Sequence, residues 1–339
     1  MATAVHWTQY LALRSLSAVV HCFDAEENMR TTGAFGSAYT LLSKKRRLRA
    51  ETNLQRSFPE LDPAEVSRLT ERSIRNMFQL ITVDMLAMPK LLKRENWHDR
   101  IELGYLSNVI RLFVEDKPAL FLTGHIGNWE VLGYILSLLG FPMNAIARPI
   151  DNPLINDWLL GLREAHGMKV ITKFGASSEV DDIVRKGGRV GFIADQNAGD
   201  KGLFVPFFGR MASSYKSIGL LAMRNEVPIV TGYARRIKDQ FRYRLITPDV
   251  IYPEDWADQP DPLFYITARY NRAMEEMVRI NPEQYFWVHR RWKSRPKWER
   301  QGDQMPSKVI AKLETLPWMT QSLLDRIIQN SRHDAGLAS

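Results

Sequence analysis

His125 and Glu130 are the pair of side chains whose types and spacing could carry out acid–base chemistry. On one continuous helix, residues five positions apart are separated by about 140° and do not meet. They can meet if His125 lies on a turn and Glu130 lies in the first turn of the following helix, and Gly124 and Gly127 make such a turn sterically easy. Glu130 would then accept a hydrogen bond from one imidazole nitrogen and leave the other as a general base for a hydroxyl.

The same two residues also allow a structural interpretation, in which they are a cap and a surface charge near a helix start. Residues 119–122 form an apolar run before them, and residues 131–139 form another after them. This pattern favours a buried strand that leads into a glycine-bearing turn and a helix that leads out of it. The context supports a catalytic interpretation, and both interpretations stay open from these residues alone.

Three further polar residues follow two other predicted strands in the same way. Arg148 comes after an apolar stretch, and Asp195 and Gln196 come after another. Because ligands of α/β folds gather at the carboxyl ends of strands, we expect His125, Arg148 and Asp195 to lie near one site. Arg148 could pair with a phosphate or form a structural salt bridge. Asp195 and Gln196 could bind acceptor hydroxyls, or Asp195 could cap the turn that follows.

Alternating strand and helix patterns follow Pro118 and predict an α/β fold, with a mostly parallel central sheet flanked by helices. The expected strands cover residues 119–123, 144–147, 169–172, 190–194, 229–235 and 243–246. The expected helices cover residues 62–88, 102–113, 129–139, 154–167, 178–186, 215–225 and 262–280. We divide the chain into an N-terminal membrane-associated helix (1–30), a helical region (31–117), an α/β core (118–300) and a C-terminal helical tail (301–339).

Net charge, cysteine content and ligand spacing limit the classes of partner, compartment and cofactor that we expect. The 339-residue chain has a formal net charge of +8, which suits lipid headgroups, an acidic protein or nucleic acid. No recognisable DNA- or RNA-binding motif accompanies the charge, so nucleic acid is not expected. Cys22 is the only cysteine, so no disulfide can form within the chain, which is typical of a reducing compartment. Asp195 has no second carboxylate or histidine at ligand spacing beside it, and we expect neither a metal nor a cofactor.

Three segments are candidates for contact with a membrane surface. Residues 5–23 are too polar for a spanning helix, which needs about 20 mostly apolar residues. Their apolar stripe, with Trp7 and Tyr10, fits an interfacial helix or an ordinary packing helix. Residues 44–49 are polybasic and could bind an anionic leaflet or form a solvated helix face. The basic, tryptophan-containing segment 289–298 suits a membrane interface or an acidic carrier protein.

Several stretches together resemble the bacterial late acyltransferases of lipid A, which belong to the H-x4-D/E glycerolipid-type acyltransferase superfamily. They are, in order, residues 53–60 (NLQRSFPE), 124–130 (GHIGNWE), 147–154 (ARPIDNPL), 195–199 (DQNAG), 204–209 (FVPFFG) and 284–293 (QYFWVHRRWK). Each stretch is weak alone, whereas the ordered set is specific to the family but not to one substrate. The resemblance covers roughly residues 30–300.

The resemblance implies an O-acyltransferase that moves a fatty acyl chain from acyl carrier protein or acyl-CoA to a hydroxyl of a lipid A precursor, an anionic glycolipid. It implies that His125 is the general base and that Glu130 assists it. The implied substrate-binding residues are Asn128, Arg148, Asn152, Arg163, Asp195 and Gln196. Arg163 could instead be a structural salt-bridge partner of Glu130. Residues 204–209 would form a packed loop or a wall for the acyl chain.

The resemblance also implies a place at the cytoplasmic face of the inner membrane, either peripheral or anchored by the N-terminus. Within enzymes, the alternative is acylation of another membrane lipid, such as a mannosylated phosphatidylinositol, an amino-acid lipid or a lysophospholipid, with acyl-CoA as donor. An inert membrane-binding scaffold that keeps the fold is an alternative of another class. A broken His125–Glu130 pair would be its signature, and both residues are present.

Overall fold

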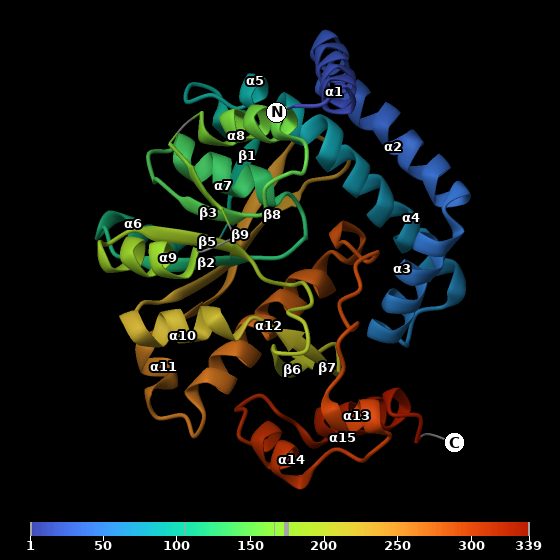
Figure 1. Cartoon of the computed structure of the whole chain (residues 1–339), viewed down its shortest axis with the longest axis vertical. Helices are drawn as coiled ribbons and strands as arrows, with labels where there is room; N and C mark the ends of the chain where they lie inside the picture. The colour runs from blue at the N-terminus through green and yellow to red at the C-terminus, as the bar shows by residue number, and fades with distance from the viewer. Residues whose placement is uncertain (1, 105, 166, 173–175, 338–339) are drawn as a thin grey trace.

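The computed structural model describes residues 2–104, 106–165, 167–172 and 176–337. It is an α/β fold built on a 7-stranded sheet of order β1-β9-β8-β2-β5-β3-β4, with helices packed on both faces (Figure 1). β2, β3, β4, β5 and β8 run parallel, β9 runs antiparallel to β8, and β1 runs parallel to β9. The predicted α/β class with a mostly parallel sheet is therefore confirmed.

The elements have the following bounds. The strands are β1 Ile101–Leu103, β2 Ala119–Thr123, β3 Asn144–Ala147, β4 Lys169–Thr172, β5 Arg189–Ile193, β6 Leu203–Phe207, β7 Arg210–Ser214, β8 Ile229–Arg236 and β9 Tyr243–Ile251. The helices up to the sheet are α1 Ala4–Cys22, α2 Ala25–Leu42, α3 Lys44–Ser57, α4 Pro63–Gln79, the π-helix η1 Leu80–Asp84, α5 Met85–Leu91, the 3-10 helix η2 Trp97–Asp99 and α6 Ser107–Val114. Those that follow are α7 Trp129–Leu138, α8 Pro153–Glu164, α9 Ala176–Arg185, α10 Lys216–Asn225, α11 Pro253–Ala257, α12 Pro262–Ile280, η3 Pro282–Gln284, α13 Lys297–Gln301, α14 Ser307–Glu314 and α15 Gln321–Asp334.

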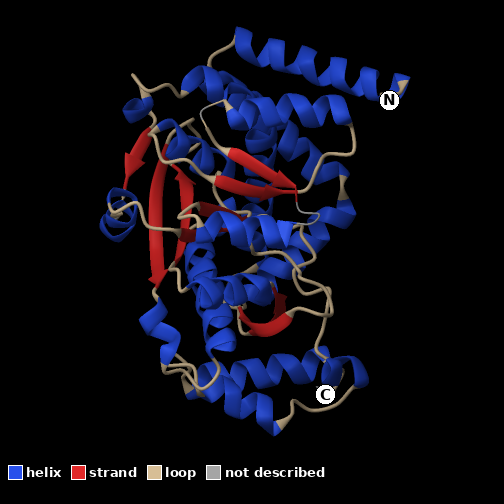
Figure 2. Ribbon diagram, turned by 60° about the vertical axis from the view of Figure 1, so that its left-hand side comes forward, coloured by secondary structure: helices blue, strands red, loops and turns tan. Residues whose placement is uncertain are grey.

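The central strand β2 is buried on both sides, which explains its continuous apolar sequence. Its alternating side chains enter two different cores. Leu120 and Leu122 pack into the largest apolar cluster, with residues of α10 and α12. Ala119 and Phe121 face the other way, toward residues of α6. Figure 2 shows helices on both sides of the sheet. Packing on both faces fixes the end of β2, where His125 follows.

Two of the helices expected from the sequence are corrected, and part of a third cannot be compared. The helix expected over 102–113 is split into strand β1 and helix α6, because β1 pairs with β9 far away in the chain. The helix expected to stop before Pro89 continues to the end of α5. The buried side chains around Pro89, which include Leu86 and Met88, outweigh the hydrogen bond that proline removes. Residue 166, within the helix expected over 154–167, lies outside the described residues.

The aromatic stretch 204–209 is a β-hairpin and not an irregular loop. Phe208 and Gly209 join β6 to β7 with positive φ angles of 54° and 65°, the conformation of a tight two-residue hairpin turn. Phenylalanine is an unusual residue in such a turn, so the sequence lacks the usual signal. Phe208 is fully buried against Trp287, in the core and away from any acyl-chain wall. Ser214 ends β7, and Tyr215 occupies the N-cap of α10.

The N-terminal helix α1 and the C-terminal helices α13–α15 lie at opposite ends of the molecule (Figures 1 and 2). The C-terminal helices are held to the hairpin by Asp334, whose carboxylate accepts hydrogen bonds from Arg56 at 2.6 Å, Arg295 at 2.7 Å and Arg210 at 3.1 Å. In the part of the chain that the structure describes, no helix is both long and apolar enough to cross a bilayer.

Candidate active site

A tight turn carries His125 from β2 into α7. Gly127 has a φ of +58°, and a Cβ at this position would lie 2.2 Å from the carbonyl oxygen of Ala234. Two backbone hydrogen bonds hold the turn, from Gly127 to the carbonyl of Gln284 at 3.1 Å and from Asn128 to Ala234 at 2.8 Å. Only glycine fits at position 127, which explains the sequence requirement for this turn.

Asn128, expected to bind substrate, is the N-cap of α7. Its side chain is fully buried, and its Oδ1 accepts a hydrogen bond from the backbone N–H of Val131 at 2.9 Å. This contact satisfies one of the free N–H groups of the first helical turn. The structure therefore places Asn128 in the support of the turn that holds His125.

Asp195 is the carboxylate that contacts His125. Its Oδ1 lies 2.8 Å from Nδ1 of His125, and its Oδ2 accepts the backbone N–H of His125 at 2.9 Å. Asp195 follows β5, which pairs with β2, so the carboxyl ends of two neighbouring strands bring the two residues together. A Cβ on Gly124 would lie 3.2 Å from the Asp195 side chain, so glycine at 124 permits this close approach.

The surroundings keep Asp195 ionised. Burial alone would raise the pKa of this carboxyl, but the charge of His125, its two hydrogen bonds and the charge of Arg291 outweigh burial and lower the pKa below its ordinary value. Burial and the nearby Asp195 charge raise the pKa of Tyr285 well above its ordinary value, so this phenol stays neutral. An ionised Asp195 accepts a hydrogen bond from Nδ1–H of His125, which leaves Nε2 as the unprotonated nitrogen of the neutral ring.

Gln196 lies against the imidazole. Its amide nitrogen is 3.3 Å from Nδ1 and 3.2 Å from Nε2 of His125. Because the in-plane directions of the two ring nitrogens diverge, an atom equally distant from both points along neither of them. Gln196 therefore restricts the ring position and does not occupy the in-plane direction of Nε2.

Glu130 does not make the hydrogen bond to His125 that the motif spacing suggested. Its two carboxylate oxygens accept hydrogen bonds from Arg163 on α8, at 2.8 Å and 2.6 Å. Burial alone would lower the pKa of Arg163, but the charge and hydrogen bonds of Glu130 raise it. The two side chains do not meet because they point in different directions. Glu130, the second residue of α7, extends toward α8, whereas the His125 side chain extends toward the residue that follows β5. Of the two interpretations of Arg163, the salt bridge with Glu130 is the one observed.

The two other predicted binding residues contact groups other than His125. Arg148 follows β3 as expected, but its side chain is 73% exposed and lies 3.7 Å from the carboxylate of Asp151. Asn152 is the N-cap of α8, and its Nδ2 donates hydrogen bonds to His6 and Gln9 of α1, at 2.9 Å and 3.0 Å. Asn152 thus joins the N-terminal helix to α8.

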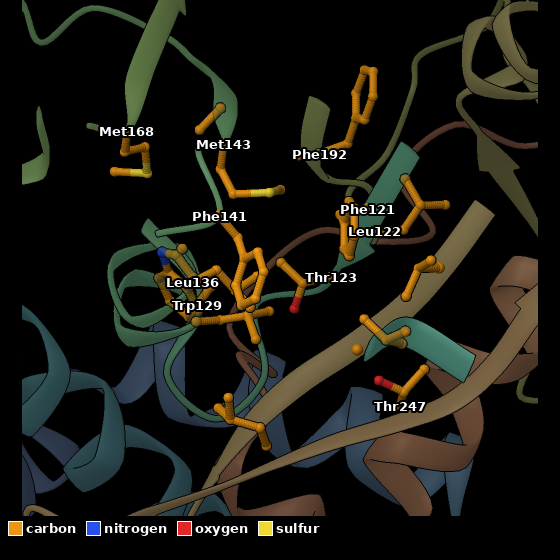
Figure 3. Close-up of a pocket in the computed structure, with 18 of the residues that line it drawn as sticks. Phe121, Leu122, Thr123, Trp129, Leu136, Phe141, Met143, Met168, Phe192 and Thr247 are labelled. Carbon is orange, nitrogen blue, oxygen red and sulfur yellow. The ribbon is translucent and has the colours of Figure 1, made fainter. Parts of the chain in front are cut away.

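A cavity of about 200 Å³ lies between the sheet and the helices α6 and α7. Figure 3 shows Trp129, Leu136 and Phe141 on one side of it and Phe121 and Leu122 of β2 on the other. Most of the side chains that line it are apolar, and they include Phe113, Phe121, Leu136, Phe141, Met143 and Val230. The polar lining includes Thr123, Glu130 and Arg163.

Trp129 connects this cavity with the histidine. It lines the cavity, and its ring packs edge-on against the His125 ring with 4.8 Å between centroids. The His125 imidazole therefore stands beside an apolar space that has the Glu130–Arg163 ion pair at its wall. Among the described residues, no group of three or more His, Cys, Asp or Glu side chains could hold a metal ion. The arrangement suits a reaction in which a hydroxyl is activated next to a bound hydrocarbon chain.

A family model described as "Bacterial lipid A biosynthesis acyltransferase" matches residues 2–294. The chain belongs to this family. It is 27% identical over 265 residues to the lipid A biosynthesis acyltransferase of Haemophilus influenzae, covering 76% of this chain and 79% of that protein. It is 27% identical over 258 residues to the lipid A biosynthesis palmitoleoyltransferase of Escherichia coli, covering 75% and 80%. It is 26% identical over 257 residues to the lauroyltransferase of the same organism, covering 75% and 81%.

Membership of the lipid A acyltransferase family confirms the resemblance seen in the sequence and the expected enzyme class, an O-acyltransferase. The names of the Escherichia coli relatives specify different acyl chains, palmitoleoyl and lauroyl. The acyl chain named therefore differs among proteins similar to this one.

The segment after α12 contributes residues that sequence reasoning missed in this acyltransferase. For segment 289–298 we considered a membrane interface or an acidic carrier protein; Arg290, Lys293 and Lys297 are exposed, whereas Arg291 is 1% exposed. Its guanidinium donates to the carbonyls of Ser213 and Gln196, to the Ser214 hydroxyl and to Asn271. The buried cation thus holds the residue after Asp195. Basic residues between tryptophans have the same pattern at a membrane surface and in a core, so the sequence could not separate the two.

Proposed function

We propose that this protein transfers a fatty acyl chain from an acyl-thioester to a hydroxyl of a lipid A precursor, with His125 as the general base. The observation that carries the proposal is the His125–Asp195 pair, held at 2.8 Å beside an apolar cavity through the shared side chain Trp129. Acyl carrier protein is the proposed donor, because the basic chain suits an acidic protein, and acyl-CoA is the alternative. The names of the similar proteins support the acceptor class.

In the proposed reaction, Nε2 of His125 removes the proton from the acceptor hydroxyl while its oxygen attacks the thioester carbonyl. The carbon–sulfur bond then breaks, and the thiolate leaves with the proton returned by the imidazolium. Asp195 fixes the ring and stabilises the imidazolium between these two proton transfers. The thioester is already activated, so no covalent acyl-enzyme is required.

The oxyanion formed at the carbonyl needs hydrogen-bond donors or a cation. The backbone N–H groups of Trp129 and Glu130 begin α7, where the first N–H groups of a helix have no partner within the helix. The Arg163 guanidinium, held by Glu130, stands at the wall of the same cavity. We assign these groups to the carbonyl end of the acyl chain and the apolar lining to its methylenes, each contributing about 0.8 kcal/mol when buried.

The proposed acceptor lies in a membrane, so the enzyme must reach a membrane surface. Helix α1 exposes Val5, Trp7, Leu11 and Val19, whereas Val20 is buried against the protein. We propose that α1 lies in the interface at the cytoplasmic face of the inner membrane.

Purified protein incubated with acyl carrier protein thioesters or acyl-CoA of several chain lengths, and with a lipid A precursor, tests the proposal. Mass spectrometry should detect the gain of one acyl chain on the acceptor. His125→Ala should lower this rate by about 10²- to 10⁴-fold, the contribution of general base catalysis. His98→Ala, at an exposed site, should leave the rate unchanged. Equal rates for His125→Ala and the unmodified protein would refute the assignment.

A further inference from the structure

Helix α2 has its apolar side chains on the outside. Its buried face consists of small and polar residues together with one methionine: Ala25, Asn28, Met29, Thr32, Gly33, Gly36 and Thr40. Its exposed face includes Ala34, Phe35, Ala38, Leu41 and Leu42, which we call the outer face of α2. Phe35, Leu41 and Leu42 are 63%, 74% and 85% exposed. A surface helix of a protein surrounded only by water normally has the opposite arrangement.

The packing of α2 on α4 fixes this orientation. A Cβ on Gly36 would lie 2.8 Å from Cα of Arg75, so the two helix backbones approach closely at this point. The buried hydroxyls of Thr32 and Thr40 donate to carbonyls of α2 itself, at 2.7 Å and 2.9 Å. Rotation of α2 to bury the leucines would separate the glycines from α4. The outer face of α2 is therefore held toward solvent. Figure 1 shows α2 at the edge of the molecule.

A cluster of positively charged residues follows the outer face of α2 directly in the chain. No charged residue occurs between Arg30 and Lys44. Lys44, Lys45 and Arg46 then form the exposed first turn of α3, which contains no acidic residue. Among the described residues, no ion pair involves Lys44 or Lys45. Cations at a helix N-terminus are disfavoured by the helix dipole, so an external anion would relieve them.

We propose that the outer face of α2, with Lys44, Lys45 and Arg46, is a docking surface for an anionic lipid bilayer, on which α2 lies in the interface. The apolar side chains would enter the acyl boundary, and the three cations would contact lipid phosphates. An uncharged apolar face that ends in a cluster of cations is complementary to a bilayer with anionic headgroups. The inference rests on the proposed function, since an acceptor held in a membrane gives the enzyme a reason to dock.

Helix α3 connects this surface with the catalytic turn. Its Asn53 donates to the carbonyls of Trp287 and His289, at 2.8 Å and 3.0 Å. The same segment pairs with the turn, through the N–H of Phe286 and the carbonyl of His125 at 3.0 Å. Eight residues of helix separate Lys45 from Asn53, a rise of about 12 Å. Docking at α2 would therefore hold the His125 turn close to the headgroup layer.

Co-sedimentation of the full chain with vesicles tests the inference, with equal parts of phosphatidylglycerol and phosphatidylcholine or with phosphatidylcholine alone. The protein should prefer the anionic vesicles and lose binding as salt is raised. Leu41→Glu with Leu42→Glu should weaken binding at least about tenfold, because two apolar side chains no longer enter the bilayer. Val114→Glu, at a site that is 76% exposed on α6, is the matched control and should bind normally.

Two further arms separate the possible outcomes. The Leu41→Glu, Leu42→Glu variant should acylate a detergent-dispersed acceptor within about twofold of the unmodified rate, whereas His125→Ala should fail with dispersed and vesicle-bound acceptors alike. Vesicle binding without any acyl transfer by the unmodified protein would refute the proposed function alone. Normal vesicle binding by the leucine variant would overturn the docking surface. The docking surface would also be overturned if light scattering showed that the unmodified protein is a dimer and the Leu41→Glu, Leu42→Glu variant is a monomer. A second copy of the chain, and not a bilayer, would then cover α2.

Discussion

Replacing Asp195 by asparagine tests the central feature of the site, because the change removes a charge and keeps the shape. Asp195 is 2% exposed and accepts two hydrogen bonds from His125, at 2.8 Å and 2.9 Å. An asparagine oxygen can still accept the backbone N–H, and its NH₂ group would then face Nδ1. That geometry favours the wrong tautomer, in which Nε2 carries the proton and cannot act as a base.

The expected loss follows from the function of Nε2. If the variant lacks a general base, the rate should fall by about 10²- to 10⁴-fold, equivalent to about 2.7–5.4 kcal/mol of transition-state stabilisation. Loss of the carboxylate also removes the partner of the imidazolium, which places the expectation in the upper half of this range. Binding of the acyl donor should change little, because Asp195 does not line the cavity.

Single-turnover acyl transfer, followed by mass spectrometry, measures the chemical step directly. Asp200→Asn is the matched control, because Asp200 follows the same strand but is 63% exposed. Thermal unfolding of each variant separates lost catalysis from lost structure. The reasoning is refuted if Asp195→Asn keeps a rate within threefold of the unmodified protein while Glu130→Gln abolishes it. That result would restore the pairing suggested by the motif spacing.

Three other predictions concern the charged pair, the cavity and the acid stability. Glu130→Gln and Arg163→Gln should each lower kcat, because Arg163 is assigned to the oxyanion. The double variant should be no worse than the more affected single variant, since the two side chains act as one unit. Gly191→Val should shift the preferred donor to a chain about two methylenes shorter, because a Cβ there meets its nearest neighbours only at 3.8 Å and the added carbons enter the cavity. His289→Asn should reduce the loss of unfolding free energy between pH 6.5 and 4. Burial lowers the pKa of His289 to about 4, so in that window the unfolded chain, with an ordinary pKa of about 6.5, binds more protons and stability falls as pH falls.

Each of these predictions has a control within the chain. Additive losses in the double variant would contradict the Glu130–Arg163 unit. Gly161→Val adds the same carbons on α8, where a Cβ meets nothing within 4 Å, and should leave the preferred chain length unchanged. If Gly191→Val left the preferred chain length unchanged, the acyl chain would bind outside this cavity. His98→Asn, at an exposed histidine, should leave the pH dependence of the unfolding free energy unchanged. If His289→Asn also left it unchanged, His289 would not be a cause of the loss of stability in acid.

The regular elements of the core could be predicted because their signals are local. The predicted bounds of β2, β3 and β4 agree with the structure, since each strand is a short apolar run between turn residues. β1 could not be found in this way, because its three residues are a strand only through pairing with β9, which is distant in the chain. The β6–β7 hairpin was missed because Phe208 occupies a turn position where asparagine or glycine is usual.

The choice between the two carboxylates shows why the site was harder than the fold. The rule for the carboxyl ends of strands placed His125 and Asp195 together, although seventy positions separate them. Sequence spacing instead favoured Glu130, because it gives proximity along the chain and no side-chain direction. In the structure, His125 and Glu130 extend to different partners, and Trp129 between them touches the imidazole and lines the cavity. The five-residue spacing therefore sets the distance from the imidazole to the cavity wall, and the carboxylate that orients the imidazole follows another strand.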